Sequence, residues 1–490
     1  MRSETLYDAL TEVDGALIDE AATPPEKQKN KQPMRLRWIG AVAAVLAAAI
    51  LLTAILRPGG GGGLTAYALE TPVYPTSAPY PDASGLMSGE TADEKAFEAA
   101  WNAWSEVRQK RWAARQAYSA DQLRGFLTAA IPAFLGGHEG ENVSCSPTNI
   151  YLALAMLAET TGGETREQIL SLLGVTDMDS LRTLANNLFV ANYNDDGATK
   201  SLLAGAIWLR DDLDYNTETL KRLAETYYAA SFRGKMGSED YDKLLRQWLN
   251  EQTGQQLADQ IGGLSFHEED VLALTTAVDF SDQWYVEFEP ERTEDGVFHA
   301  VGGDLACRMM RQDIDSAGFY YWGDRFGAVT LSFKNGGQTR FLLPDEGVTP
   351  EALLEDPEAL SFLLTENVWN WENSKNLIVH LSVPKFDVSS QLTLNQALWD
   401  LGITDAFQPD KADFSPLTGA EEVSLSEIKH GTRIAVDEKG VTASAYTIIP
   451  GPGAAPHPEE EIDFTLDRPF LFAVYGEDNL PLFVGIVNQP

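Results

Sequence analysis

A strand pattern that runs directly into a proline- and glycine-rich loop is the feature that most limits how this chain can fold. Residues 432–436 (TRIAV) alternate polar and apolar side chains, and residues 437–440 (DEKG) supply a turn. Small or apolar side chains then recur on one face of an extended segment, at Val441, Ala443 and Ala445. The segment enters PGPGAAP at residues 450–456, which cannot continue a strand. We interpret this as a strand that can join a sheet but is attached to an exposed loop.

The chain from residue 119 onward alternates helical and strand patterns without the regular spacing of βαβ units, which indicates an α+β fold with large mixed or antiparallel sheets. At 490 residues with 44% hydrophobic content, the chain can bury a large core. Helical patterns include residues 121–135, 149–160, 164–173 and 391–401, and strand patterns include residues 202–209, 271–280, 376–388 and 430–437.

Six motifs occur in order along this part of the chain. They are CSPTNI at 145–150, GGETREQI at 162–169, VDFSDQW at 278–284, VPKF at 383–386, LGITDAF at 401–407 and DRPFLF at 467–472. Together they resemble the serpins, a family of serine protease inhibitors. The resemblance implies a serpin fold over residues 119–490, with about eight to nine helices around three β-sheets and an exposed reactive-centre loop.

The resemblance also assigns hinge residues at the base of the loop. In serpins a Lys of a Pro-Lys motif pairs with the Glu that begins the hinge, and the matching residues are Lys385 and Glu438. A strand that enters between two packed strands must fit beneath their side chains without overpacking them, so small residues are required after this Glu. The implied hinge residues are Glu438, Gly440, Val441, Ala443 and Ala445.

A second implied group lies beneath the sheet that the hinge would enter. His430 matches the family's shutter histidine, while Ser146 and Asn149 match polar positions at the start of the facing helix. Trp284 matches the tryptophan beneath the point where insertion begins. Thr276 stands where the family usually has Asn, so we expect the hydrogen bonds around His430 to be arranged differently.

The bond that a protease would cleave is set by distance from the hinge. Seventeen family positions counted from Glu438 place it between Ala454 and Ala455, whereas counting back from Pro469 gives residues 458–459, because the loop is about four residues longer than usual. We favour the first count, since distance from the hinge decides how far a trapped protease is carried. A small residue at the primary site suits an extracellular elastase-like or subtilisin-like serine protease.

The N-terminal part predicts a membrane anchor. Residues 39–56 are apolar and uncharged, and at ~1.5 Å per residue they are just long enough for a hydrocarbon core ~30 Å thick. Basic residues precede this span, so residues 1–38 are expected in the cytosol and the serpin domain outside the cell. The alternative is a cleaved signal peptide, although Arg57-Pro58-Gly59 is a poor cleavage site. Residues 57–91 are typical of a flexible linker and residues 92–118 of a helical extension. The apolar stripe of this helix is expected to pack on the domain, with binding to a cell-wall or partner surface as the alternative; it comprises Phe97, Trp101, Trp104, Val107 and Trp112.

The net charge of −37 disfavours nucleic acid as a partner. No hydrolase, nucleotide-binding or zinc motif occurs, and the six histidines lack metal-ligand spacing. We therefore expect no enzyme activity, no cofactor and no metal, and a monomeric inhibitor. A non-inhibitory serpin that acts as a surface adhesion or chaperone-like protein remains the alternative. Cys145 and Cys307 are expected as small apolar residues, with one disulfide as the other option.

Overall fold

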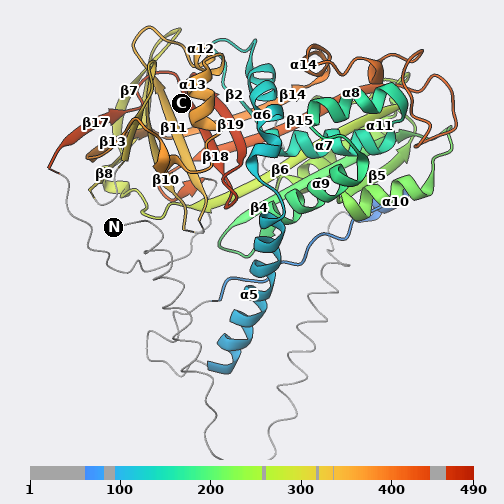
Figure 1. Cartoon of the computed structure of the whole chain (residues 1–490), viewed down its shortest axis with the longest axis horizontal. Coiled ribbons are helices and arrows are strands. Elements are labelled where there is room, and N and C mark those ends of the chain that lie inside the picture. The colour runs from blue at the N-terminus through green and yellow to red at the C-terminus, as the bar shows by residue number, and fades with distance from the viewer. Residues whose placement is uncertain (1–60, 82–93, 256–260, 316–318, 335, 442–458) are drawn as a thin grey trace, which may run out of the picture. The chain divides into compact units, whose positions relative to one another are not determined.

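The computed structural model describes residues 61–81, 94–255, 261–315, 319–334, 336–441 and 459–490 (Figure 1). Contacts divide the chain into residues 1–61 and residues 62–490, and the fold is that of the second unit. Within the described residues, no helix combines the length and the apolar character that crossing a bilayer requires. The predicted anchor at residues 39–56 and the segment before it lie outside the described residues.

Eleven α-helices occur among the described residues, more than the eight to nine predicted, because α3 and α5 precede residue 119. The helices are α3 (Gly61–Tyr67), α5 (Glu94–Gln116), α6 (Ala120–Leu135), α7 (Pro147–Thr160), α8 (Gly163–Leu173), α9 (Met178–Asn192), α10 (Thr217–Thr226), α11 (Glu239–Gln252), α12 (Pro350–Leu354), α13 (Pro357–Leu363) and α14 (Asn395–Asp400).

The described strands form three sheets, in agreement with the predicted number. Sheet A has the order β1 (Ala68–Glu70), β5 (Ala229–Gly234), β4 (Lys200–Arg210), β6 (Leu272–Gln283), β16 (Gly440–Val441), β15 (Leu425–Val436) and β14 (Phe386–Thr393), with β3 (Asn194–Asp195) also paired to β4. Sheet B has the order β12 (Ser374–Asn376), β9 (Phe319–Trp322), β10 (Phe326–Ser332), β11 (Gln338–Pro344), β18 (Phe470–Tyr475), β19 (Pro481–Val487) and β2 (Val143–Cys145). Sheet C has the order β17 (Glu461–Thr465), β13 (Ile378–Pro384), β8 (Gly303–Ile314) and β7 (Glu294–Ala300).

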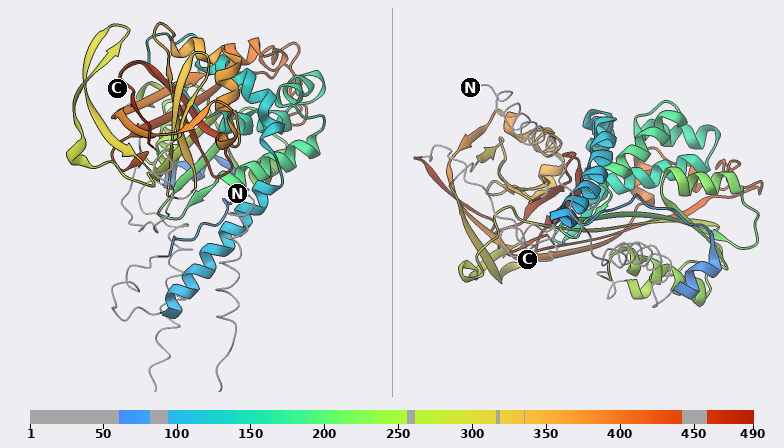
Figure 2. Two further views of the ribbon diagram at one scale, coloured as in Figure 1. Left: turned by 60° about the vertical axis from the view of Figure 1, so that its left-hand side comes forward. Right: turned by 90° about the horizontal axis from the view of Figure 1, so that it is seen from below.

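Sheet A has helices on one face and, over one end of its other face, α11 and α3, as the right-hand view of Figure 2 shows. Alternate side chains of a strand point to opposite faces, and β4 is apolar on both. Leu203 and Ile207 join the main core beneath α7, while Ala204 and Trp208 join a second apolar cluster that includes residues of α11. Burial on both faces explains why the central strands read as continuous apolar runs.

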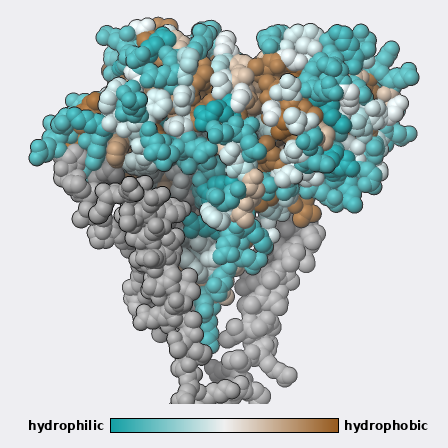
Figure 3. Space-filling model, in the orientation of Figure 1, coloured by the Kyte–Doolittle hydropathy of each residue, from teal (hydrophilic) through white to brown (hydrophobic). Residues whose placement is uncertain are grey.

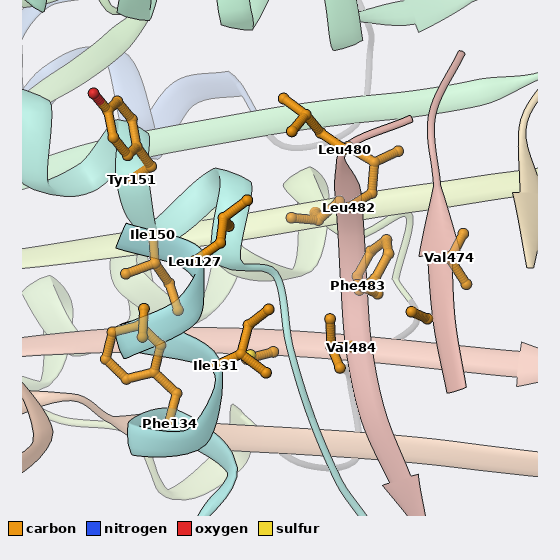
Figure 4. Close-up of a cluster of buried hydrophobic side chains, with 14 of the residues drawn as sticks. Leu127, Ile131, Phe134, Ile150, Tyr151, Val474, Leu480, Leu482, Phe483 and Val484 are labelled. Atoms are coloured by element: carbon orange, nitrogen blue, oxygen red, sulfur yellow. The ribbon is translucent and has the colours of Figure 1, made fainter. Parts of the chain in front are cut away.

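The main core also joins sheet B to two helices. Figure 4 shows Leu127 and Ile131 of α6 on the side toward Phe483 and Val484 of β19, and Phe134 beside Ile150 of α7. Every residue of β19 is buried. The helix α7 begins with Pro147 at its first turn, a position where the missing N–H costs no hydrogen bond, and every residue of α7 is buried. This helix therefore provides a fixed support beneath sheet A.

Part of the predicted linker has regular structure instead. β1 pairs antiparallel with the edge strand β5, and Leu64 and Tyr67 of α3 pack against the cluster that α11 covers. An edge strand has unpaired backbone groups, and these accept a further strand wherever apolar residues can be buried beside it. The sequence 64–68 (LTAYA) supplies those apolar residues.

The helical extension is held at its C-terminal end. Arg115 forms an ion pair with Glu477 at 3.0 Å, and the hydroxyl of Tyr118 donates to Asp478 at 2.6 Å. Its aromatic stripe packs on the domain only in part, because Trp101 is 44% exposed and Trp112 is 53% exposed. The face of α5 turned to the viewer in Figure 3 is largely hydrophilic. The expected packing of the whole stripe is therefore wrong.

The helix predicted over residues 391–401 is also shorter than expected. Strand β14 continues to Thr393, where it pairs with Lys429 of β15, and α14 covers only Asn395–Asp400. Pairing with the neighbouring strand overrides the local helical pattern.

Cys145 and Cys307 are free thiols, so no disulfide joins them.

Candidate functional site: an opening in sheet A

Two neighbouring strands of sheet A separate part of the way along their length. β15 and β6 run parallel and pair from Leu425 and Leu272 as far as Gly431 and Ala277. Further along, β16 lies between them, opposite Gln283 and Asp282 of β6 and Val436 of β15. Among the described residues, no strand fills the space between these two zones. The sheet therefore has an opening with a two-residue strand at one end.

Gly440 and Val441 form this short strand, and both suit the position. A Cβ atom at residue 440 would overlap the carbonyl oxygen of Asp282, so only glycine allows the strand to approach β6 so closely. Val441 has no exposed surface and belongs to the main core. The first residues of the predicted hinge are thus already paired with both neighbours.

Glu438, immediately before the strand, is fixed on two sides. Its Oε2 atom accepts from Lys385 Nζ at 2.7 Å and its Oε1 atom accepts from the Thr293 hydroxyl at 3.0 Å. Burial alone would raise the pKa of Glu438, but hydrogen bonds from Lys385, its own backbone N–H and Thr293 outweigh it and lower this pKa. The carboxylate is therefore ionised at neutral pH and holds the start of the hinge against β14.

Trp284 holds the same segment from the other side. Its backbone N–H donates to the carbonyl of Lys439 and its indole Nε1 donates to the carbonyl of Asp437, each at 2.9 Å. The indole is buried and stacks on Phe333 with ring centroids 5.1 Å apart. Residues 437–439 are thus anchored on both sides of the opening.

His430 lies where the pairing of β15 with β6 ends. Its Nε2 atom accepts from the backbone N–H of Ser146 at 2.8 Å. Because Nε2 accepts, Nδ1 carries the ring hydrogen and donates to the Thr276 hydroxyl, 2.6 Å away. Thr276 therefore contacts the histidine directly at the position where the resemblance led us to expect a different arrangement. Asn149 donates from Nδ2 to the carbonyl of Ala277 at 3.0 Å, one residue further along β6.

Three further polar residues, which the sequence reading did not single out, complete this cluster. The backbone N–H of Ser144 donates to Ser390 Oγ at 2.7 Å, and Ser144 Oγ lies 2.9 Å from Thr432 Oγ1. A signal for one of them was present, because Thr432 stands two residues from His430 on β15 and so shares its face of the strand.

Burial lowers the pKa of His430 to about 3, from an ordinary value of 6.5. The unfolded chain binds a proton near pH 6.5 and the folded chain does not, so stability is complete above that pH and falls as the pH drops toward 3. Between pH 6.5 and pH 5 we expect a loss of about 2 kcal/mol from this group. Urea unfolding of the wild type and of His430→Gln across this range measures it. The exposed His299 and His380 are present in both proteins, so their titration affects both equally. If the free energy of unfolding changes with pH by the same amount in the wild type and in His430→Gln, the expectation is contradicted.

Ala443, Ala445, Ala454 and Ala455 lie outside the described residues. The described residues form an opening in sheet A. Glu438 and Trp284 hold the entrance of this opening, and a buried polar cluster centred on His430 lies where the pairing of β15 with β6 ends. Such an arrangement can accept a strand, because the polar groups can change partners when the neighbouring strands move apart.

Comparison with known proteins identifies relatives of this chain. A family model described as "Serpin (serine protease inhibitor)" matches residues 129–490. The human leukocyte elastase inhibitor is 28% identical over 358 residues, which is 71% of this chain and 93% of that protein. Plasminogen activator inhibitor 1 of Bos taurus is 28% identical over 394 residues, covering 76% of this chain and 93% of that protein.

Solved structures show the same fold. The thermophilic serpin tengpin in its native state aligns with a TM-score of 0.66 and 28% identity over 75% of this chain and 93% of its own. Thyroxine-binding globulin in complex with thyroxine aligns with a TM-score of 0.65 and 22% identity, over 76% of this chain and 99% of its own. At 22% identity, the similarity to thyroxine-binding globulin shows a shared fold and nothing further.

Proposed function

Because this chain belongs to the serpin family, we propose that it inhibits a serine protease by suicide trapping. The target attacks the loop as a substrate and forms an acyl-enzyme. Residues beyond Val441 then enter sheet A between β6 and β15 and carry the protease with them. The observation that supports this proposal most directly is the opening in sheet A, with Gly440 and Val441 already paired antiparallel to both neighbours.

The energy available supports the same mechanism. If about ten residues gain ladder hydrogen bonds worth ~1 kcal/mol each, insertion releases on the order of 10 kcal/mol. This is comparable to the whole stability of an ordinary domain, so it is enough to distort a protease active site. Pro450 and Pro452 cannot donate to a sheet, and we propose that insertion ends near Ile449.

We propose cleavage between Ala454 and Ala455 by an elastase-like or subtilisin-like protease outside the cell. A small apolar residue before the cleaved bond fits a shallow apolar pocket better than the acidic pocket of a trypsin-like enzyme. One of the relatives is named as an inhibitor of leukocyte elastase, which is consistent with this choice.

Incubation of the protein with pancreatic elastase tests the proposal. We expect a complex that survives denaturing electrophoresis and a released peptide whose first residue is Ala455 in mass spectrometry. Trypsin is the control protease and should be trapped far less. Cleavage without any stable complex would instead identify a non-inhibitory serpin that serves as an adhesion or chaperone-like protein.

We further propose that residues 39–56 anchor the chain in the cell membrane, with the serpin domain outside. The support is the apolar, uncharged span that follows a cluster of basic residues. Cell fractionation should recover the full chain with membranes, whereas a soluble product that begins near Gly59 would contradict the anchor.

A further inference from the structure

A hollow of about 660 Å³ is lined by Trp284 and by none of the residues of the polar cluster around His430. It is lined by the turn after β6, by β8, β9 and β10, and by the segment that follows α13. We call it the aromatic groove and define it by Trp284, Gln312, Phe319, Thr330, Glu366 and Trp369. Its volume lies within the range of small-molecule sites in proteins.

The walls of the aromatic groove are flat rings. Phe319 and Trp369 meet edge to face with centroids 4.6 Å apart, and Trp284 forms a buried wall. Trp369 is 57% exposed, and Tyr285 and Val286, which also line the groove, are 50% and 55% exposed. A flat aromatic molecule would bury the exposed parts of Phe319 and Trp369 in offset or edge contacts.

The groove is held in shape by a buried arginine. Arg340 donates to the carbonyls of Phe362 at 2.7 Å and Thr365 at 2.9 Å, which fixes the C-terminal end of α13 against sheet B. The segment that carries Glu366 and Trp369 follows at once, and Asn367 Oδ1 accepts from the backbone N–H of Trp369 at 3.1 Å. The wall is thus formed before any ligand binds.

Two residues that line the groove each carry a buried polar atom without a partner. Gln312 Oε1 and Thr330 Oγ1 are both buried, and neither has a hydrogen bond to any described residue. A buried amide oxygen without a donor costs free energy, which a ligand O–H or N–H group would recover. Glu366 is the one charged residue among the described residues that line the groove. This charge disfavours an anion.

We propose that the aromatic groove binds a small, flat aromatic molecule that is uncharged or cationic and carries at least one hydrogen-bond donor. The rings supply apolar area, Gln312 Oε1 and Thr330 Oγ1 accept from the donor, and Glu366 excludes negatively charged ligands. The groove shares Trp284 with the entrance of the opening in sheet A, but it includes none of the residues of the polar cluster around His430.

A matched pair of fluorescent probes tests the proposal. N-phenyl-1-naphthylamine is uncharged and has one N–H donor, while 1-anilinonaphthalene-8-sulfonate has the same rings with an added sulfonate. We expect the uncharged probe to bind at one site per chain, at least tenfold more tightly than the sulfonate. Glu366→Gln should narrow this difference by strengthening sulfonate binding several-fold.

Two variants place the probe in the groove. Trp369→Ala should weaken binding of the uncharged probe at least tenfold, and Gln312→Met should weaken it two- to fivefold. Trp399→Ala is the control, because Trp399 is 42% exposed on α14 and does not line the groove. Thermal melts verify that the variants fold. Equal binding of the two probes, or wild-type affinity in Trp369→Ala, would overturn the proposal.

Discussion

The Ala443→Arg variant is expected to be cleaved by the target protease without trapping it. Val441 is already buried in the core between β6 and β15, and residues two apart on a strand share a face. Ala443 would therefore enter the same core as the strand extends. An arginine there would be a buried charge without a partner. The free-energy cost of burying it exceeds the stabilisation from the next backbone hydrogen bonds of the inserting strand. We expect the yield of electrophoresis-stable complex to fall at least tenfold while the loop is still cut.

The matched control is Ser444→Arg. Residue 444 would face the other side of the sheet, where the neighbouring strand β6 presents Asp279 and Ser281, which alternate with the core residues Val278 and Phe280. Polar neighbours make an arginine far less costly on this face, so Ser444→Arg should retain most of the trapping. Equal behaviour of the two variants would show that the alternate faces are not distinguished, which would contradict strand insertion in this register.

Cleavage of the loop is expected to raise the melting temperature. Insertion worth on the order of 10 kcal/mol, set against an unfolding entropy of ~2 cal/mol/K per residue, gives a rise of on the order of 10 °C. Differential scanning calorimetry before and after limited cleavage within residues 442–458 measures this rise. The cleaved Ala443→Arg variant serves as the control and should show little or no gain. An unchanged melting temperature in the cleaved wild type would mean that the loop does not insert.

The sequence was most informative where a motif fixes a residue to a strand end. Lys385 follows the last residue of β13 and Glu438 precedes β16, so a resemblance at two short motifs predicted two charges that lie 2.7 Å apart. Both residues sit at fixed positions in the sheet, and little in the intervening chain can alter their distance.

Features that depend on tertiary pairing were harder to predict. The sequence of residues 61–70 gives no sign that β5 has an open edge, so it predicts a linker where β1 forms. Residues 391–393 have helical neighbours but pair with β15. The aromatic groove is assembled from segments as far apart as Trp284 and Trp369, each of which resembles an ordinary core or loop segment when considered alone.

The directions of the strands around the opening have a consequence that does not depend on any side chain. β6 and β15 are parallel neighbours, whereas β16 is antiparallel to both. A strand that continued from β16 would replace one parallel ladder, with slanted hydrogen bonds, by two antiparallel ladders whose bonds lie perpendicular to the strands. Both new ladders would have the more stable hydrogen-bond geometry. The direction of the inserting strand alone therefore makes the filled sheet more stable than the open one.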